Sequence, residues 1–376
     1  MKKFQGVKIF IFLFIISVLA SGCGVSFKSP SAQSNVTLTN GGIYKSVDFG
    51  NTWKQVSLIN TVSPNIPTFT SGNITVLAID PNDDNAFYAG INQGGLIYTY
   101  DGAQSWTTAT SLKKITINDI VVSHENKCVI FVASTNKIYK SVDCARTWHQ
   151  TYNDNDPATK INTITVDPTN SAIVYAGTSR SELLESKDSG KSWIAKYRFD
   201  IPANRTSRSG MGSTVVNRIL VNPRNTKNLW VSTEGDAIYR SLDGGASWKH
   251  YRDDFFEINP QAVRIRDMAI AQIDGRTIIV ATDAGILKSA DLGESWDNVA
   301  LIPPSQRTPI NKIAMAVFDT NVIYYVTDTT LGVSRNGGRT WESKVLPSER
   351  KGSALVLDSH NSNIVYLGVF LLEEKK

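Results

Sequence analysis

The sequence contains few of the residues that most often carry catalysis or metal binding. Its 376 residues include only four histidines and three cysteines. It has no phosphate-binding loop, no CxxC pair and no nucleophile elbow. The histidines are scattered without metal-ligand spacing, at His124, His149, His250 and His360. The sequence therefore predicts no metal site and no cofactor.

Long apolar runs and an excess of one charge are also missing. The only extended apolar run, Ile9 to Leu19, is too short to span a bilayer and has the length of a signal-peptide core. Removing the three lysines around it (Lys2, Lys3 and Lys8) from 39 basic residues leaves 36 against 34 acidic residues. A body so close to neutral excludes an electrostatic surface for nucleic acid. We expect an exported, soluble body.

The apolar run ends in Leu19-Ala20-Ser21-Gly22-Cys23. These residues resemble the bacterial lipoprotein cleavage box, although Ala20 stands where leucine is commoner. The resemblance implies a signal peptide over residues 1–22 and lipidation of Cys23. It also implies an anchor in a membrane of the bacterial cell envelope, with the protein facing the periplasm or the exterior. The small polar residues of 23–36 are typical of a flexible tether. Ordinary cleavage that leaves a free thiol is the alternative.

One short phrase recurs seven times along the rest of the chain. RSLDGGASW, residues 240–248, is one copy, and KSVDFGNTW, which ends at Trp53, is another. The serine or threonine that opens each copy follows the previous one by 53, 42, 45, 55, 48 and 45 residues. Periods of this size indicate a repeat architecture. Seven of the eight tryptophans close a copy: Trp53, Trp106, Trp148, Trp193, Trp248, Trp296 and Trp341.

Each repeat contains the pattern of four short strands. A segment such as INTITVDP (161–168) has alternating apolar residues and a polar turn, and a second strand such as IVYAGT follows it. A third strand leads into the repeated phrase, and the tryptophan opens a fourth. Four antiparallel strands per repeat predict an all-β, seven-bladed β-propeller over residues 37–370, followed by a tail at 371–376. The chain begins at a third strand and ends after a second, so both ends should complete one blade and close the ring.

The repeated phrase resembles the Asp-box, the sialidase-type BNR repeat. The resemblance covers nearly the whole chain from about residue 40. A carboxylate in each turn can accept backbone N–H groups, and glycine supplies the permissive backbone, although Ala103 and Ala145 replace it in two copies. A group present in every blade favours a structural role over catalysis. The residues concerned are Asp48, Asp101, Asp143, Asp188, Asp243, Asp291 and Asn336.

Two places could carry a function. Arginine and aromatic residues gather in the longer connections between blades and predict a binding patch, for which solvated loops are the alternative. The patch comprises Arg198, Arg205, Arg208, Arg218, Tyr251, Arg252 and Arg266. The third residues of the first strands should line the mouth of the central channel, where mixed charges indicate either a polar funnel or mutual neutralisation. These residues are Val76, Asp119, Thr163, Arg218, Asp267, Lys312 and Ala354.

Asp-box propellers include sialidases, xyloglucanase-type glycosidases, sortilin-type receptor domains and photosystem II assembly factors, so the fold alone does not choose a function. The arginine-isoleucine-proline motif of sialidases is missing, whereas VDPTNSAIVYAGT (166–178) resembles xyloglucanase phrasing. Only Asp119 and Asp267 could form the carboxylate pair of a glycoside hydrolase. We favour a monomeric, membrane-tethered binding or assembly scaffold for an envelope protein, peptide or glycan.

Cys128 and Cys144 remain once Cys23 is lipidated. An even pair of cysteines in an oxidising compartment favours a disulfide. Cys128 should begin the second strand of its blade, and Cys144 lies in the turn after the third strand. Since these strands run antiparallel, we expect both residues at one face of the same blade. Two unbonded thiols are the alternative.

Overall fold

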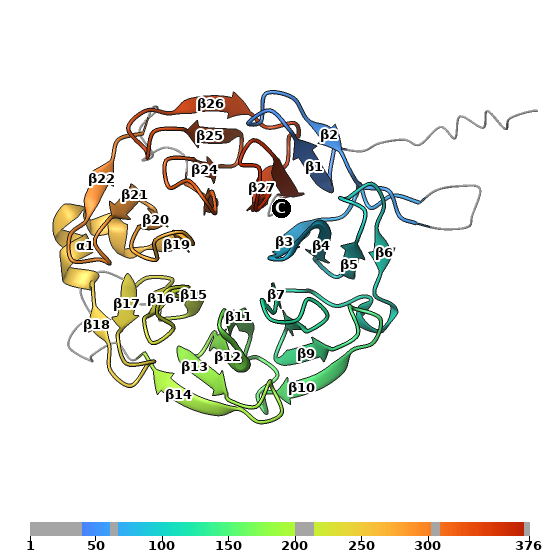
Figure 1. The fold of residues 1–376 in the computed structure, drawn as a ribbon, viewed down its shortest axis with the longest axis horizontal. Coiled ribbons are helices and arrows are strands. Elements are labelled where there is room, and N and C mark those ends of the chain that lie inside the picture. Colours follow the sequence, from blue (N-terminus) through green and yellow to red (C-terminus); the bar gives the residue numbers. More distant parts are fainter. Residues whose placement is uncertain (1–39, 61–66, 200–213, 302–308, 372–376) are drawn as a thin grey trace, which may run out of the picture. The chain divides into compact units, whose positions relative to one another are not determined.

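The computed structural model describes residues 40–60, 67–199, 214–301 and 309–371. These residues form seven four-stranded antiparallel sheets arranged as the blades of a ring (Figure 1). The predicted all-β, seven-bladed propeller is confirmed. The first strand of each blade faces the centre of the ring and the fourth lies at its rim (Figure 1). The sheets pack face to face around the ring, and each has two edge strands: the first strand, whose free edge faces the central channel, and the fourth strand at the rim.

The blades are numbered here in chain order. Blade 1 contains β27 (Lys351–Leu357), β28 (Val365–Phe370), β1 (Ile43–Ser46) and β2 (Lys54–Gln55). Blade 2 contains β3 (Ile74–Asp80), β4 (Asp83–Ile91), β5 (Gly95–Thr99) and β6 (Thr107–Thr108). Blade 3 contains β7 (Asp119–Val122), β8 (Ile130–Ser134), β9 (Lys137–Ser141) and β10 (His149–Asn153). Blade 4 contains β11 (Ile161–Asp167), β12 (Asn170–Thr178), β13 (Glu182–Ser186) and β14 (Ile194–Arg198).

The remaining three blades repeat the same order. Blade 5 contains β15 (Val216–Val221), β16 (Leu229–Thr233), β17 (Ile238–Ser241) and β18 (Lys249–His250). Blade 6 contains β19 (Ile265–Ile270), β20 (Ile278–Thr282), β21 (Gly285–Ser289) and β22 (Asp297–Val299). Blade 7 contains β23 (Lys312–Met315), β24 (Ile323–Val326), β25 (Thr330–Ser334) and β26 (Glu342–Val345).

Blade 1 joins the two ends of the chain, as predicted. Strand β28 pairs with β1 in antiparallel register, with Tyr44 opposite Leu367 and Ser46 opposite Val365. The C-terminal part of the chain therefore supplies the two inner strands of this blade, and the N-terminal part supplies the two outer ones. This arrangement closes the ring with backbone hydrogen bonds.

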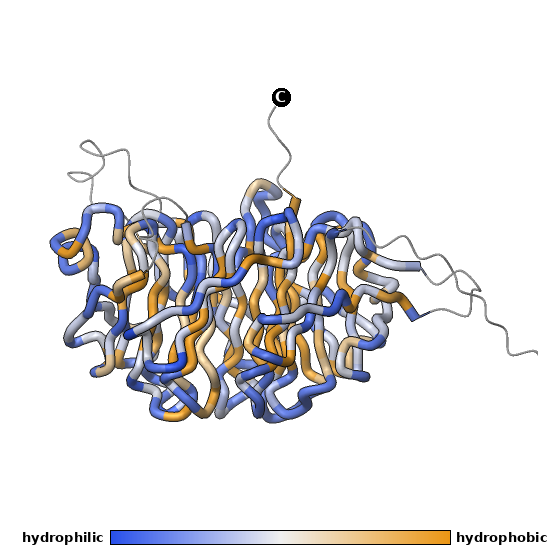
Figure 2. Tube along the Cα trace, turned by 90° about the horizontal axis from the view of Figure 1, so that it is seen from above, coloured by the Kyte–Doolittle hydropathy of each residue, from blue (hydrophilic) through white to orange (hydrophobic). Residues whose placement is uncertain are grey.

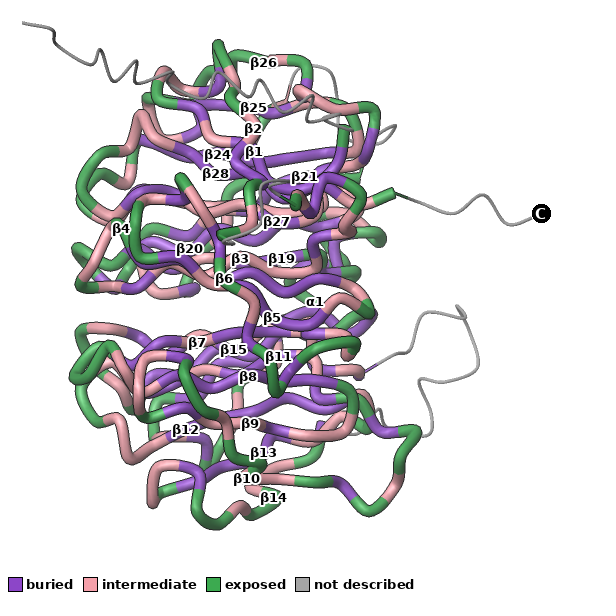
Figure 3. Tube along the Cα trace, turned by 90° about the vertical axis from the view of Figure 1, so that its right-hand side faces the viewer, coloured by how far each residue is buried: buried purple, intermediate pink, exposed green. Residues whose placement is uncertain are grey.

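The core lies between the blades rather than inside any one of them. Between blades 2 and 3, for example, Tyr88 and Leu96 pack against Ile117 and Val132, all fully buried. Figure 2 shows apolar residues along the strands and hydrophilic turns at both faces, and Figure 3 shows the strands largely buried. Burial of each such aliphatic side chain contributes about 1.5–3 kcal/mol. The ring is thus stabilised by seven similar interfaces.

The repeated phrase forms a tight turn between the third and fourth strands. In every copy the two residues after the aspartate or asparagine position have positive φ, such as Leu292 at 64° and Gly293 at 81°. The alanines that replace glycine adopt the same conformation, with φ of 67° at Ala103 and 63° at Ala145. Two consecutive left-handed residues match the right-handed twist of the flanking strands. We call the face with these turns the box face and the opposite one the connection face.

A single α-helix among the described residues, α1 (Arg252–Ile258), follows blade 5. The 3₁₀ turn Pro260–Val263 follows α1 in the same connection, and another, Thr110–Leu112, lies between β6 and β7. Helix α1 docks through Phe255, which is fully buried and packs edge-on against Trp296. None of the helices in the described ranges has the length and apolarity needed to cross a bilayer.

Candidate functional site

The carboxylates of the Asp-box turns are fully used within their own turns. Asp48 accepts hydrogen bonds from the backbone N–H of Thr52 at 2.9 Å and from its hydroxyl at 2.7 Å. The Ser46 hydroxyl donates to the same carboxylate and accepts from the Gly50 N–H. Asn336 reproduces the pattern, since its Oδ1 accepts from the Thr340 N–H and its Nδ2 donates to the Thr340 hydroxyl. These contacts hold the turn together and leave little capacity for a substrate.

The same hydrogen bonds stabilise the charged form of these carboxylates. The backbone N–H and hydroxyl of Thr52 lower the pKa of Asp48 to about 2. Hydrogen bonds from Thr147 and Ser192 lower the pKa of Asp143 and Asp188 to about 2 as well. The pKa values of Asp243 and Asp291 are also lowered, by Ser247 and Ser295 respectively. A carboxylate with so low a pKa is a poor general acid or base near neutral pH.

The two cysteines of blade 3 lie side by side on the box face. The Cys144 N–H donates to the Cys128 carbonyl, and the structure pairs the two residues as a disulfide with their Cα atoms 3.9 Å apart. Corresponding backbone hydrogen bonds join the Asp-box turn to the first hairpin in other blades, as from Gly102 to Asn85 and from Gly337 to Asn321. The crosslink therefore adds to a contact that the repeat already makes.

The predicted arginine and aromatic residues that fall within the described ranges do not form one patch in the structure. Arg205, Arg208 and Cys23 lie outside the described residues. Tyr251 is only 1% exposed and packs against Trp230 and Trp296, so its place is in the core and not on a binding surface. The sequence prediction placed Tyr251 in an exposed connection because it comes directly after the fourth strand of blade 5. Docking of α1, which begins at the next residue, covers its side chain.

Arg252 also has a different environment from the one expected. Its guanidinium donates to Asp236 at 3.0 Å, and Tyr239 donates to the same buried carboxylate at 2.6 Å. His250 stacks on the ring of Tyr239, with 4.1 Å between centroids. Burial raises the pKa of Asp236, but hydrogen bonds from His250 and Tyr239 lower it by more, so the net shift is downward. This cluster attaches the start of α1 to the turn between β16 and β17.

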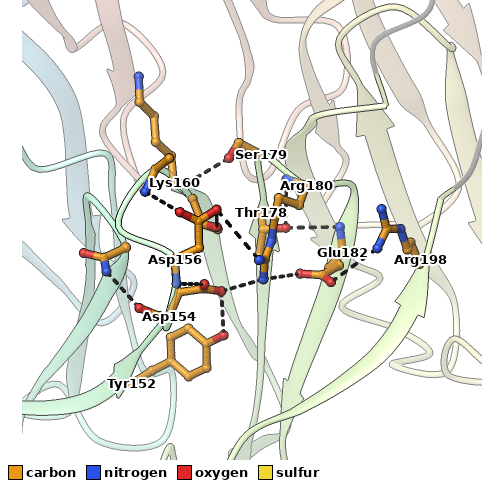
Figure 4. Close-up of polar contacts among 12 residues, drawn as sticks. Tyr152, Asp154, Asp156, Lys160, Thr178, Ser179, Arg180, Glu182 and Arg198 are labelled. Atoms are coloured by element: carbon orange, nitrogen blue, oxygen red, sulfur yellow. Dashed lines mark hydrogen bonds and ion pairs between the residues drawn. The ribbon is translucent and has the colours of Figure 1, made fainter.

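Arg198 belongs to a polar network at the connection-face end of blades 3 and 4 (Figure 4). Its Nη1 lies 3.9 Å from Glu182, which also accepts from Arg180 at 3.3 Å. Arg180 donates in turn to Asp154 at 2.9 Å, and the Tyr152 hydroxyl donates to the same carboxylate (Figure 4). Acidic and basic groups alternate here, so the network satisfies itself and offers little net charge to a partner.

A cavity opens at the mouth of the central channel on the connection face. Its volume is about 750 Å³. Four basic side chains line it, and they come from the starts of the first strands of blades 6, 7 and 1: Arg264, Arg266, Lys312 and Lys351. Glu234 and Asp283 are its acidic residues, and Phe370 is its one aromatic residue.

A ring of hydrogen bonds surrounds this mouth. At six of the seven blade junctions, the residue at the second position of the first-strand sequence segment (Asn162 in INTITVDP and its counterparts in the other blades) donates through its side chain to a backbone carbonyl of the next blade. Asn118, for example, donates to the Ile161 carbonyl at 2.8 Å, and Asn311 donates to that of Gly352 at 3.0 Å. The other donors are Thr75, Asn162, Asn217 and Ser353. The seventh position is Arg266, whose Nε instead binds Asp283 of its own blade at 2.5 Å.

Deeper in the channel, the third-position charges largely neutralise one another. Arg218 lies 4.0 Å from Asp119 and 3.8 Å from Asp267, and so bridges the pair that the sequence suggested as catalytic. Burial lowers the pKa of Arg218, but the charges of Asp267 and Asp119 raise it by more. Asp119 also accepts from the Thr163 hydroxyl and the Ile164 N–H, each at 2.9 Å. Both carboxylates are only 6% exposed.

Sequence reasoning missed the ring of second-position donors and the basic arc, which consists of Arg264, Arg266, Lys312 and Lys351 at the channel mouth. A signal was present, because asparagine recurs as the second residue of INDIVV, INTITV, VNRILV and INKIAM. The third-position charges were noted, but their pairing depends on side-chain directions that spacing does not reveal. In the structure, Arg218 pairs with Asp119 and Asp267, whereas Lys312 is the third-position charge that takes no part in this pairing.

Another grouping emerges only from ring closure. Asp84 of blade 2 meets Asp358 and His360 of blade 1, and their candidate ligand atoms all lie within 4.8 Å of one another. His360 Nδ1 lies 2.5 Å from Asp84 Oδ2, while Asp358 accepts from the His360 and Asn361 N–H groups. These contacts join the first and second blades. Among the described residues, this is the one cluster whose donor set would suit a divalent cation.

Comparison with known proteins provides structural neighbours but no sequence family. No protein-family model matches the sequence, and no curated protein matches it. The GH74 xyloglucanase of Xanthomonas campestris superposes with a TM-score of 0.65 at 17% identity, over 80% of this chain and 51% of that one. The chain thus spans about half the length of this enzyme.

Two further structural neighbours are structures of YCF48, and the match extends over nearly the whole length of each. YCF48 from Cyanidioschyzon merolae superposes with a TM-score of 0.61 at 15% identity, over 81% of this chain and 97% of that one. A structure of YCF48 bound to a D1 peptide has a TM-score of 0.59 at 14% identity, and the match covers 81% of this chain and 94% of that one. At these identities the likeness shows the fold alone.

Proposed function

We infer that this propeller is a non-catalytic binding scaffold that holds a polypeptide segment at the channel mouth on its connection face. The single observation that carries this proposal is the cavity of about 750 Å³ with four basic side chains at its rim. Cavities of this size on a rigid scaffold are the usual location of ligand sites. That YCF48 has been captured with a peptide supports a peptide ligand for this fold.

The geometry favours a peptide over a glycan. Sugar rings are usually held on aromatic side chains, and Phe370 is the one aromatic residue among the described residues that line the mouth. It also lies under the Lys351 ammonium, 5.5 Å from its ring centroid. A peptide offers backbone groups to the polar rim and needs no such platform.

A glycoside hydrolase is the less favoured function. It would require Asp119 and Asp267 to face a substrate between them. Arg218 stands between these carboxylates instead. Asp267 also accepts a hydrogen bond from the Ile313 N–H at 3.2 Å. The likeness to the xyloglucanase supports the fold and carries no argument for a catalytic role of Asp119 and Asp267.

The proposal includes a membrane tether through Cys23, which rests on the lipoprotein-type cleavage box in the sequence. Cys23→Ala should block lipid attachment and release the protein from the membrane fraction, or leave it as an uncleaved precursor. Mass spectrometry of the mature N-terminus is the direct measurement. An unmodified N-terminus in an unchanged membrane fraction would contradict the tether and leave the binding proposal intact.

The binding proposal is tested by site-specific photo-crosslinking in the native envelope. A benzophenone side chain at Glu234, which is exposed at the mouth, should form protease-sensitive adducts with a polypeptide. The matched control carries the same group at Asn51, an exposed position on the box face. Adducts from the Asn51 position alone would place the partner on the wrong face and overturn the proposal.

A further inference from the structure

The basic arc at the channel mouth has a feature that the repeat does not explain. Lys312 lines both the mouth cavity and the deeper cavity of the channel. The residue is half-buried, and within the described ranges its side-chain ammonium has neither a hydrogen bond nor an ion pair. The nearby charges of Asp119, Arg218 and Asp267 are occupied with one another. An unpaired ammonium in a partly buried site is costly unless an anion joins it.

The second feature is the break in the ring of cross-blade hydrogen bonds. Arg266 stands where the other blades carry Asn, Thr or Ser, and it turns to Asp283 instead of bonding the next blade. It adjoins Lys312 in the next blade and lines the same cavity. Departures from a repeat rule that lower local consistency are typical of functional positions. Both departures occur at the junction of blades 6 and 7.

The charge balance defines the group that would fit. Arg264 and Arg266 share Asp283, at 3.9 and 2.5 Å, while Lys312 and Lys351 have no carboxylate partner within the described ranges. Counted over the described residues, the mouth therefore carries four cations against two anions. Deeper in the channel, Asp119, Asp267 and Arg218 add one net negative charge. The mouth and the channel together therefore retain one net positive charge. A single monoanion matches this charge better than a dianionic phosphate does.

We propose that Lys312, with Arg266 and Lys351 beside it, forms a subsite for a carboxylate of the bound polypeptide. The inference rests on the proposed function, since it names the group by which a segment at the mouth is anchored. Lysine and arginine bind carboxylates through charge-assisted hydrogen bonds, which are shorter and stronger than neutral ones. The carboxylate belongs either to the C-terminus of the segment or to an aspartate or glutamate side chain.

The test uses the full chain and three pools of random-sequence octapeptides as probes. The first pool has free C-termini and no acidic side chains, the second has amidated C-termini and one glutamate, and the third is amidated without acidic residues. We expect the first or second pool to bind about tenfold more tightly than the third, the size of one charge-assisted hydrogen bond. The pool that binds identifies the source of the carboxylate.

Variants of the arc provide the controls. Lys312→Met keeps an unbranched side chain that is one atom shorter, removes the charge and should abolish the advantage of the carboxylate pools. Arg266→Gln should reduce it. Lys160→Met, an exposed lysine on the same face outside the cavity, should leave it unchanged. Thermal melting of each variant separates lost binding from lost folding.

The outcomes also separate this inference from the proposed function. Equal binding of all three pools, unaffected by Lys312→Met, would overturn the carboxylate subsite while leaving peptide binding in place. A carboxylate preference that survives both arc variants would also overturn it. If the parent protein bound none of the three pools, the proposed function would be contradicted, and the carboxylate subsite with it.

Discussion

Tyr44 near the start of the described chain is paired in register with Leu367 near its end, so a single sheet contains both. This pairing closes the ring. Removal of the C-terminal strands is therefore predicted to destabilise the whole propeller and not blade 1 alone. Deleting residues 352–376 takes away β28 and nearly all of β27, which leaves β1 with an open edge and exposes the interfaces of blades 7 and 2. Open, apolar edges associate. We expect aggregation and loss of a cooperative melting transition, measured by size-exclusion chromatography and calorimetry.

A monodisperse truncated protein with the parental melting temperature would contradict ring closure as the source of stability. Val345→Ser is a suitable control, because Val345 in β26 is 81% exposed and contributes little to any interface. That variant should remain monomeric and melt close to the parent.

Acid should weaken the propeller through its Asp-box turns. Asp48, Asp143 and Asp188 have pKa values of about 2 in the folded chain, against an ordinary value of 3.8. As the pH falls, the unfolded chain takes up protons first, so the stabilisation is present above about pH 4 and is lost towards pH 2. The midpoint of urea unfolding should therefore fall steeply across that interval.

The chain itself suggests the control for the acid experiment. Asn336 makes the turn contacts without a titrating group. A triple variant with asparagine at positions 48, 143 and 188 should fold and show a flatter dependence of the urea midpoint below pH 4. An equally steep dependence in the triple variant would assign the acid sensitivity to other groups.

Much of the fold follows from the sequence because the same physical problem recurs seven times. Each Asp-box turn needs two left-handed residues and a carboxylate or amide, and this requirement leaves a visible phrase with a fixed spacing. Even the exceptions are informative, since Ala103 and Ala145 hold positive φ where glycine is expected. The offset between the first turn and the last strands likewise predicts the composite blade.

The candidate site was less accessible to sequence reasoning because it depends on departures from the repeat. Tyr251 has the composition of an interface residue, but docking of α1 covers it. Arg218 and Arg252 have the charge of a binding surface, but Asp119, Asp267 and Asp236 pair with them. Lys312 resembled its charged neighbours in sequence, and only the geometry separates it from them. Asp84 and His360 meet only because the ring closes.

Removal of either channel carboxylate, Asp119 or Asp267, should lower the free energy of unfolding, because both groups have a structural role. Asp119→Ala leaves the Ile164 N–H, the Thr163 hydroxyl and Arg218 without their acceptor in a site that is 6% exposed. We expect a loss of about 2–3 kcal/mol in the free energy of unfolding, measured with urea. Asp267→Ala should cost less, because that carboxylate accepts from a single backbone group, Ile313 N–H.

A different result would support the hydrolase. If Asp119→Asn and Asp267→Asn kept the parental urea midpoint and each abolished a measurable glycosidase turnover, the pair would be catalytic. Arg218→Met would then be expected to alter that turnover, since Arg218 contacts both carboxylates.

The crosslink between Cys128 and Cys144 should stabilise blade 3 on the box face. The two cysteines are 16 residues apart, and closing a loop of this length contributes about 3 kcal/mol in the chain-entropy model. The turn that holds Cys144 is also one of the two in which alanine replaces glycine at the second left-handed position, here Ala145 with φ of 63°. The double variant Cys128→Ser with Cys144→Ser should therefore unfold at lower urea concentration than the parent. Alkylation of the unfolded but unreduced mature protein is the direct measurement, and two reactive thiols there would show that no bond forms.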